Sequence, residues 1–235
     1  MTGNDTGARQ TPRFDPARTL TVVSGLPRAG TSLLMQMLAA AGLALAVDER
    51  RGPDADNPRG YYELDAVRRI RDDASFLQAL AGRAVKIVVP LVRELPADLD
   101  HRVLLVERDL TEVLASQRAM LLRRGEAGEA GASGADQAEQ DRRLAELFER
   151  RLRDVRARLE AAPNVALHVV AHGALIARPE ATSVRIAEFL ERTGALVDAD
   201  GRAIDATLAA RRMAAVVDPS LHRWRAGPGI APGTG

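Results

Sequence analysis

The feature that most restricts the fold of this chain is an apolar run, a glycine-bearing turn and an amphipathic segment in direct succession. The run covers residues 20–24 (LTVVS) and is rich in β-branched side chains, which predicts a short buried strand. Residues 31–41 carry apolar side chains on one face at helical spacing, which predicts a helix. A strand, a tight turn and a helix in this order direct free backbone N–H groups and the positive helix end toward one point. The stretch therefore predicts an anion site.

The turn has the outline of a phosphate-binding loop, but its cation is in an unusual place. Gly25 and Gly30 are five residues apart and Thr31-Ser32 follow, yet the lysine of a Walker A loop is absent. Arg28 lies inside the loop instead, and its planar guanidinium suits phosphate-like oxygens. The missing lysine disfavours an ATP or GTP phosphotransferase. An ordinary Gly/Pro turn that leads into a helix is the structural alternative.

Periodicity along the rest of the chain predicts strands that alternate with helices. This alternation predicts an α/β fold, a three-layer α/β/α P-loop-like domain with a central parallel sheet of about five strands. Asp109, followed by Glu112, predicts the start of a helix near Leu110. Further strands are expected over residues 84–89, 103–106 and 165–170, and further helices over 64–80, 137–161, 180–192 and 204–216.

Length and composition predict one domain with no strong charge preference. The chain has 235 residues, and we expect a single domain over residues 18–226, flexible tails over 1–17 and 227–235, and a flexible Gly/Ala-rich loop over about 125–135. Its 33 basic and 32 acidic residues nearly cancel, so neither nucleic acid nor a membrane is an expected partner. The first residues lack the apolar core of a signal peptide, which favours a cytoplasmic location. The oligomeric state is left open.

Two segments resemble the nucleotide-binding motifs of sulfotransferases that use 3′-phosphoadenylyl sulfate (PAPS). GLPRAGTS is similar to their 5′-phosphosulfate loop, and HRVLLVERDLTEVLASQRAM is similar to their 3′-phosphate motif. The resemblance implies that Arg108 and Ser116 bind the 3′-phosphate of PAPS and of its product PAP. In this interpretation the donor is also held by loop residues Gly25, Pro27, Arg28, Ala29, Gly30, Thr31 and Ser32. A capped helix with a surface arginine at 108 is the alternative.

A third segment, RAVKIVVP, resembles a sulfotransferase strand that carries a lysine and a catalytic histidine. Lys86 falls at the position of that lysine and is the only lysine of the chain, whereas Val88 falls at the position of the histidine. Valine cannot accept a proton from an acceptor. The alternative for Lys86 is a lysine at a strand end that reaches solvent.

The resemblance therefore requires another general base. Tyrosyl-protein sulfotransferases and some bacterial members take an acidic residue from the segment after the first helix, which here offers Glu49 as first choice and Asp48 as second. Glu63 is a third possibility, and all three can also be solvated loop carboxylates. Arg28 and Lys86 would stabilise charge on the leaving phosphate. No metal is implied, and the His168/His172 pair is not expected to bind one.

The sequence thus predicts a PAPS-dependent sulfotransferase that acts on a hydroxyl or amine of a small molecule, glycan or protein. A PAPS- or PAP-binding protein without activity is the first alternative, and a P-loop kinase is the second. Tyr61 and Tyr62 are candidates for the acceptor pocket, with a packed loop anchor as the alternative. Residues 222–225 place the only tryptophan among basic side chains and can either cover the nucleotide or form a plain tail.

Overall fold

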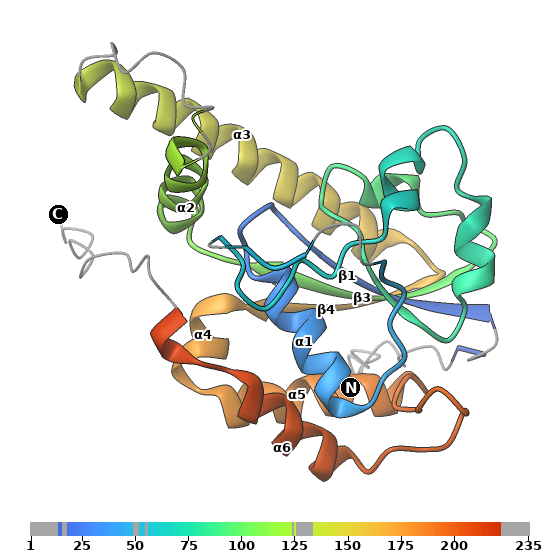
Figure 1. The fold of residues 1–235 in the computed structure, drawn as a ribbon. Coiled ribbons are helices and arrows are strands. Elements are labelled where there is room, and N and C mark those ends of the chain that lie inside the picture. Colours follow the sequence, from blue (N-terminus) through green and yellow to red (C-terminus); the bar gives the residue numbers. More distant parts are fainter. Residues whose placement is uncertain are drawn as a thin grey trace, which may run out of the picture.

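The computed structural model describes residues 14–15, 18–48, 52–54, 56–123, 125 and 134–221. Within these residues the chain forms an α/β domain, in which a parallel sheet lies between helices on both of its faces (Figure 1). The sheet has four strands in the order β2-β1-β3-β4. The predicted α/β/α architecture is confirmed, and the expected number of about five strands is wrong.

The strands are β1 (Thr19–Gly25), β2 (Ala84–Lys86), β3 (Asp100–Glu107) and β4 (Val165–Ala171). Each neighbouring pair is parallel, with Val22 of β1 opposite Val85 of β2 and Val103 of β3. Every residue of β1 is buried, as expected of a parallel strand that is covered on both faces.

The chain beside β2, at the edge of the sheet, pairs too briefly to form a fifth strand. Leu45 makes one isolated parallel bridge with Ala84 at the free edge of the sheet. The chain then leaves this edge, because the amide of Asp48 donates to the carbonyl of Glu63 at 2.9 Å. One bridge is too little pairing for a strand.

Helices cover the two faces unequally. On one face lie α1 (Thr31–Ala41), α4 (His172–Ala177), α5 (Pro179–Arg192) and α6 (Ala206–Val216). The other face carries α2 (Leu110–Arg123) and α3 (Gly134–Ala161), which project beyond the sheet at one end (Figure 1). The expected helix over 31–41 is confirmed with the same bounds. Asp109 caps α2 as predicted, since its Oδ1 accepts from the amides of Thr111 and Glu112.

The prediction of one continuous helix over residues 64–80 is wrong. Two short 3₁₀ helices, η2 (Asp65–Arg69) and η3 (Ser75–Leu80), replace it. Asp72 and Asp73 lie between them, and the Asp73 carboxylate accepts from the amide of Ser75 at 2.8 Å. A short polar side chain that bonds to a nearby backbone amide competes with helix continuation. Further 3₁₀ turns are η4 (Val92–Glu94) and η5 (Pro219–Leu221).

The core lies on both sides of the sheet and includes a residue from the expected N-terminal tail. Phe14 is 7% exposed and packs against the buried cluster. At the other end of the expected flexible loop, α3 already begins at Gly134. The remaining residues of the expected tails and most of that loop lie outside the described residues. No helix within the described part of the chain is long and apolar enough to cross a bilayer.

Candidate functional site

A cavity of about 420 Å³ opens at the carboxyl edge of the sheet. The loop after β1 leads to α1 on one face of the sheet, and the loop after β3 leads to α2 on the other (Figure 1). Residues of both connections line the cavity, among them Arg28 and Arg108. Ligands of open α/β sheets bind at such a point. The lining side chains include Pro27, Arg28, Thr31, Ser32, Asp56, Arg59, Tyr61, Glu63, Lys86, Val88, Arg108, Met120, His172 and Ile176.

The loop between β1 and α1 needs both of its glycines. A Cβ on Gly25 would lie 2.8 Å from the carbonyl oxygen of Val106 in β3, which is closer than real contacts allow. Gly30 has φ 104°, and a Cβ there would lie 2.6 Å from Cδ2 of His172. Arg28 also adopts a positive φ of 72°, a strained conformation for a residue with a side chain. Gly30 adopts its positive φ without strain, whereas Arg28 is held in its conformation at an energetic cost.

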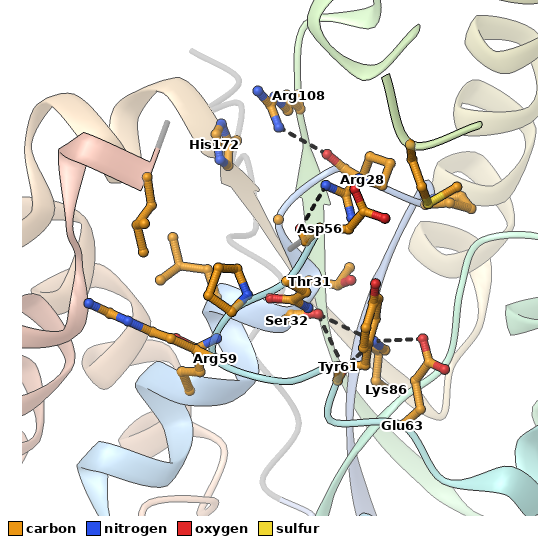
Figure 2. Close-up of a pocket in the computed structure, with 18 of the residues that line it drawn as sticks. Arg28, Thr31, Ser32, Asp56, Arg59, Tyr61, Glu63, Lys86, Arg108 and His172 are labelled. Atoms are coloured by element: carbon orange, nitrogen blue, oxygen red, sulfur yellow. Dashed lines mark hydrogen bonds and ion pairs between the residues drawn. The ribbon is translucent and has the colours of Figure 1, made fainter. Parts of the chain in front are cut away.

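Arg28 joins the two segments that were predicted to bind the nucleotide. Its Nε donates to Oγ of Ser116 at 3.0 Å. Its carbonyl oxygen accepts from Arg108 at 3.1 Å (Figure 2). Ser116 is only 2% exposed. Burial lowers the pKa of Arg28 below its ordinary value, and the nearby Asp56 carboxylate opposes this effect. These three predicted residues lie together although 88 positions separate Arg28 from Ser116.

A smaller cavity of about 80 Å³ lies beside these residues. Arg28, Arg108 and Ser116 line it, and so does Arg123 from the last turn of α2. Its size and its cationic lining suit one tetrahedral anion better than a nucleoside.

Lys86 lies at the other end of the main cavity (Figure 2). Its side chain is 5% exposed, and its ammonium donates to the carbonyl oxygen of Tyr61, to Ser32 Oγ at 3.4 Å and to Glu63 Oε1 at 3.2 Å. The loop itself has no lysine, but the ammonium of Lys86, at the end of β2, lies beside the first turn of α1. The site has cations at both ends, one set around Arg28 and one at Lys86.

The three candidate carboxylates have different positions. Glu63 lines the cavity and is ion-paired with Lys86. Asp48 is not among the lining residues, and its Oδ2 accepts from the amide of Asp65 at 2.5 Å, where it caps η2. Glu49 lies outside the described residues. Of the two candidates that lie within the described residues, Glu63 is the one at the cavity.

Some of the other predicted residues line the cavity and some do not. Pro27 and Thr31 line the cavity, whereas Ala29 of the same loop is buried and its amide donates to the carbonyl oxygen of Leu26. Tyr61 lines the cavity, but Tyr62 does not. Residues 222–225 lie outside the described part of the chain.

Sequence reasoning assigned no role at the cavity to several of its polar residues, among them Asp56, Arg59 and His172. Asp56 lies on the loop that crosses the site, and no local pattern in DNPRG indicates its contact with the arginines. His172 was considered only as a metal ligand, yet its ring packs on Gly30 and lines the cavity. Its place directly after β4 was the usable signal, because residues at the carboxyl ends of parallel strands share one edge.

Val88 lines the cavity. It is the residue that aligns with the histidine of the sulfotransferase strand that RAVKIVVP resembles. His168 lies elsewhere and stacks on Phe189, with ring centroids 5.2 Å apart. Among the described residues, no group of three or more His, Cys, Asp or Glu side chains is arranged to hold a metal ion.

The fold and the cavity define an α/β protein with buried and half-buried cations around a strand–loop–helix turn. Comparison with protein-family models gives no match, and comparison with curated proteins gives none either. The function must therefore be argued from the site.

Proposed function

We propose that this protein binds PAPS and transfers its sulfuryl group to a hydroxyl or amine acceptor. The observation that carries the proposal is the link through Arg28 between the β1–α1 loop and Ser116, with Arg108 bonded to the same loop. This arrangement provides two separate anion subsites, one at the loop and one at the small cavity. PAPS differs from ordinary adenylates by carrying a 3′-phosphate in addition to its 5′-phosphosulfate, so it needs two such subsites.

The reaction would be an in-line displacement at sulfur. The acceptor oxygen or nitrogen forms a bond to sulfur, the bond from sulfur to the bridging phosphate oxygen breaks, and its electron pair remains on PAP. Lys86 and Arg28 would offset the negative charge that grows on this oxygen. The backbone N–H groups at the start of α1 would hold the 5′-phosphate.

The acceptor proton would pass to the carboxylate of Glu63. Glu63 is the one candidate of the three carboxylates that lines the cavity within the described residues, and it lies 3.2 Å from Lys86. Val88 has no group that could take the proton. A carboxylate acts as a general base when it lies within hydrogen-bond reach of the proton. We place Glu63 first and retain Glu49 as the alternative.

A PAPS- or PAP-binding protein without transferase activity is the second candidate. The observation that favours it is the ion pair between Glu63 and Lys86, which occupies both groups that the chemistry would use. Binding would be the same for both candidates, and only turnover separates them. A P-loop kinase is the third possibility, and it would prefer ATP to PAP.

Thermal unfolding in the presence of PAP, AMP or ATP tests the nucleotide assignment, because a ligand of the native state raises the melting temperature. We expect PAP to stabilise more than AMP or ATP at equal concentration. Ser116→Ala should remove much of the advantage of PAP over AMP, whereas Ser183→Ala, another fully buried serine on α5, should not. Equal shifts with PAP and AMP would contradict the assignment.

Transfer of radiolabelled sulfate from PAPS to a panel of phenols, alcohols, amines and tyrosine peptides tests the activity. Incorporation into any acceptor, abolished by omission of the protein, supports the sulfotransferase. Tight PAP binding with no incorporation across the panel supports the binding protein.

A further inference from the structure

A short segment that crosses the site carries a carboxylate into the arginine cluster. We call residues 56–60 the strap. At one end the Oδ1 of Asp56 accepts from Nε of Arg123 at 2.8 Å and from a second nitrogen of the same guanidinium. At the other end Arg59 donates to the carbonyl oxygen of Val216 at 2.6 Å and pairs with Asp218 at 3.3 Å. Hydrogen bonds and ion pairs thus connect the strap to α2, to the last residue of α6 and to the segment that follows α6.

Asp56 is enclosed among cations. Its side chain is 6% exposed, and its carbonyl oxygen accepts from Arg28 at 3.1 Å (Figure 2). Among the described residues it is also the one acidic residue that lines the small cavity, where Arg28, Arg108 and Arg123 supply three guanidinium groups. An arginine fork that holds one carboxylate can hold a phosphate in the same way.

Charge balance argues against a carboxylate and a phosphate in this cluster together. The three guanidinium groups face two carboxylates, those of Asp56 and Glu112, and Glu112 is bonded to Arg108 at 2.8 Å within one turn of α2. A phosphate monoester carries a charge of about −1.5 to −2 at neutral pH. Its arrival would leave the cluster negative unless one carboxylate departs. Asp56 lies on a non-helical segment, so it can leave at lower cost than Glu112.

We propose that Asp56 is an internal counterion that occupies the arginine subsite in the ligand-free protein, and that the 3′-phosphate of the nucleotide replaces it. Arg123, which no motif marked, then becomes a third ligand of this phosphate. The inference rests on the proposed function, since it assumes a nucleotide with a 3′-phosphate.

The replacement couples the nucleotide subsite to the acceptor end of the cavity. The strap continues directly into Tyr61, whose carbonyl oxygen accepts from both Lys86 and Ser32. Glu63 follows two residues later. Release of Asp56 by PAPS therefore loosens the segment that leads to the proposed base.

Binding measurements by calorimetry with PAP and AMP test the competition. Asp56→Asn keeps the shape but removes the charge, so PAP should bind about tenfold more tightly while AMP changes by less than about twofold. Arg123→Gln should weaken PAP by about tenfold and leave AMP unchanged. The matched controls are Arg118→Gln and Asp141→Asn, which break another ion pair between α2 and α3 away from both cavities. They should leave both affinities unchanged.

The outcomes separate the inference from the function on which it rests. If the unaltered protein does not prefer PAP to AMP, the proposed function fails and the inference fails with it. If it prefers PAP, but Asp56→Asn does not tighten PAP binding or Arg123→Gln does not weaken it, the inference alone is overturned.

A distance measurement keeps the proposal testable if either variant fails to fold. The chain has no native cysteine, so Pro53→Cys, which is exposed just before the strap and lines neither cavity, and Leu122→Cys, which is exposed on α2, provide a pair of spin-label sites with Asp56 intact. Saturating PAP should lengthen the distance between the labels, and saturating AMP should not. An unchanged distance with PAP bound would overturn the replacement.

Discussion

Lys86 and Glu63 form an ion pair at the edge of the cavity, with Nζ 3.2 Å from Oε1. Lys86 ends β2 and is buried, whereas Glu63 precedes η2 and its side chain is 34% exposed. Because the ammonium also donates to Tyr61 and Ser32, it ties the segment before η2 to the first turn of α1. A carboxylate that solvent can reach is thus held next to the proposed phosphate loop.

Replacing Glu63 by glutamine should abolish most of the turnover and leave nucleotide binding in place. The amide has nearly the same shape but cannot accept the acceptor proton, so kcat should fall by about 10²–10⁴-fold. Sulfate transfer and PAP affinity are the two measurements. Glu94→Gln, which alters a carboxylate near Arg71 outside the cavity, is the control and should retain full activity. Unchanged turnover in the Glu63 variant would return the role of base to Glu49.

Lys86→Met should slow the transfer step more than it weakens PAP. The ammonium is proposed to act on charge that develops as the sulfuryl group leaves, so its loss should lower kcat by about 10²–10³-fold. PAP lacks the sulfuryl group, and its affinity should change little. Arg83→Met, just before the same strand and exposed, is the matched control. An equal loss in kcat and in PAP affinity would mean that Lys86 only holds the nucleotide.

Gly30→Ala should destabilise the protein through two separate effects. A positive φ strains any residue with a side chain, and the new methyl group would contact His172. Urea unfolding should show a loss of about 1–3 kcal/mol. The double variant Gly30→Ala/His172→Ala should regain only the part of the unfolding free energy that is lost to the clash with His172.

Gly173→Ala is the control for this pair, because a Cβ there meets nothing within 4 Å. If Gly30→Ala is as stable as the unaltered protein, the loop does not hold the conformation described here.

The stability of the fold should decline in mild acid because of a histidine far from the cavity. His101 lies in β3, and its Nε2 is 2.8 Å from the carbonyl oxygen of Pro96, so Nε2 carries the proton. Nδ1 is buried with no hydrogen-bond partner, and burial lowers the pKa of His101 below its ordinary value of 6.5. The unfolded chain therefore binds the second proton more readily than the folded protein does.

The free energy of unfolding should consequently be constant above pH 6.5 and fall as the pH drops below that value. Burial and nearby arginines lower the pKa of His168 as well, so it adds to the same trend. Urea unfolding between mildly acidic and neutral pH measures the effect. His101→Gln should reduce the slope, and a slope that does not change would exclude His101 as its source.

Most of the fold could be predicted because its elements are encoded locally. The apolar spacing over residues 31–41 and the buried runs at β1, β3 and β4 identify those elements without tertiary information. The prediction of a single helix over residues 64–80 failed because of a local hydrogen bond. The Asp73 carboxylate caps a new turn at Ser75 and overrides the helical spacing of the apolar residues.

The site was predictable only where a motif is continuous in sequence. The loop residues and the pair Arg108 and Ser116 belong to such motifs, and the structure brings them together. Glu63, by contrast, reaches the cavity because the chain after α1 crosses the sheet edge and returns beside Lys86. The path of such a loop depends on contacts with distant elements, so neither the sequence nor its resemblance to sulfotransferases could place Glu63 ahead of Glu49.

Because the chain has a single lysine, proteolysis at that residue can be used to measure how often the buried part of the fold opens. A lysine-specific protease has one peptide bond to cut in the whole chain, the bond after Lys86. That bond joins two buried residues at the end of the edge strand β2, Lys86 and Ile87. Cleavage can occur only in molecules whose core has opened, so the rate at which two fragments appear reports opening of the core without interference from frayed ends or surface loops.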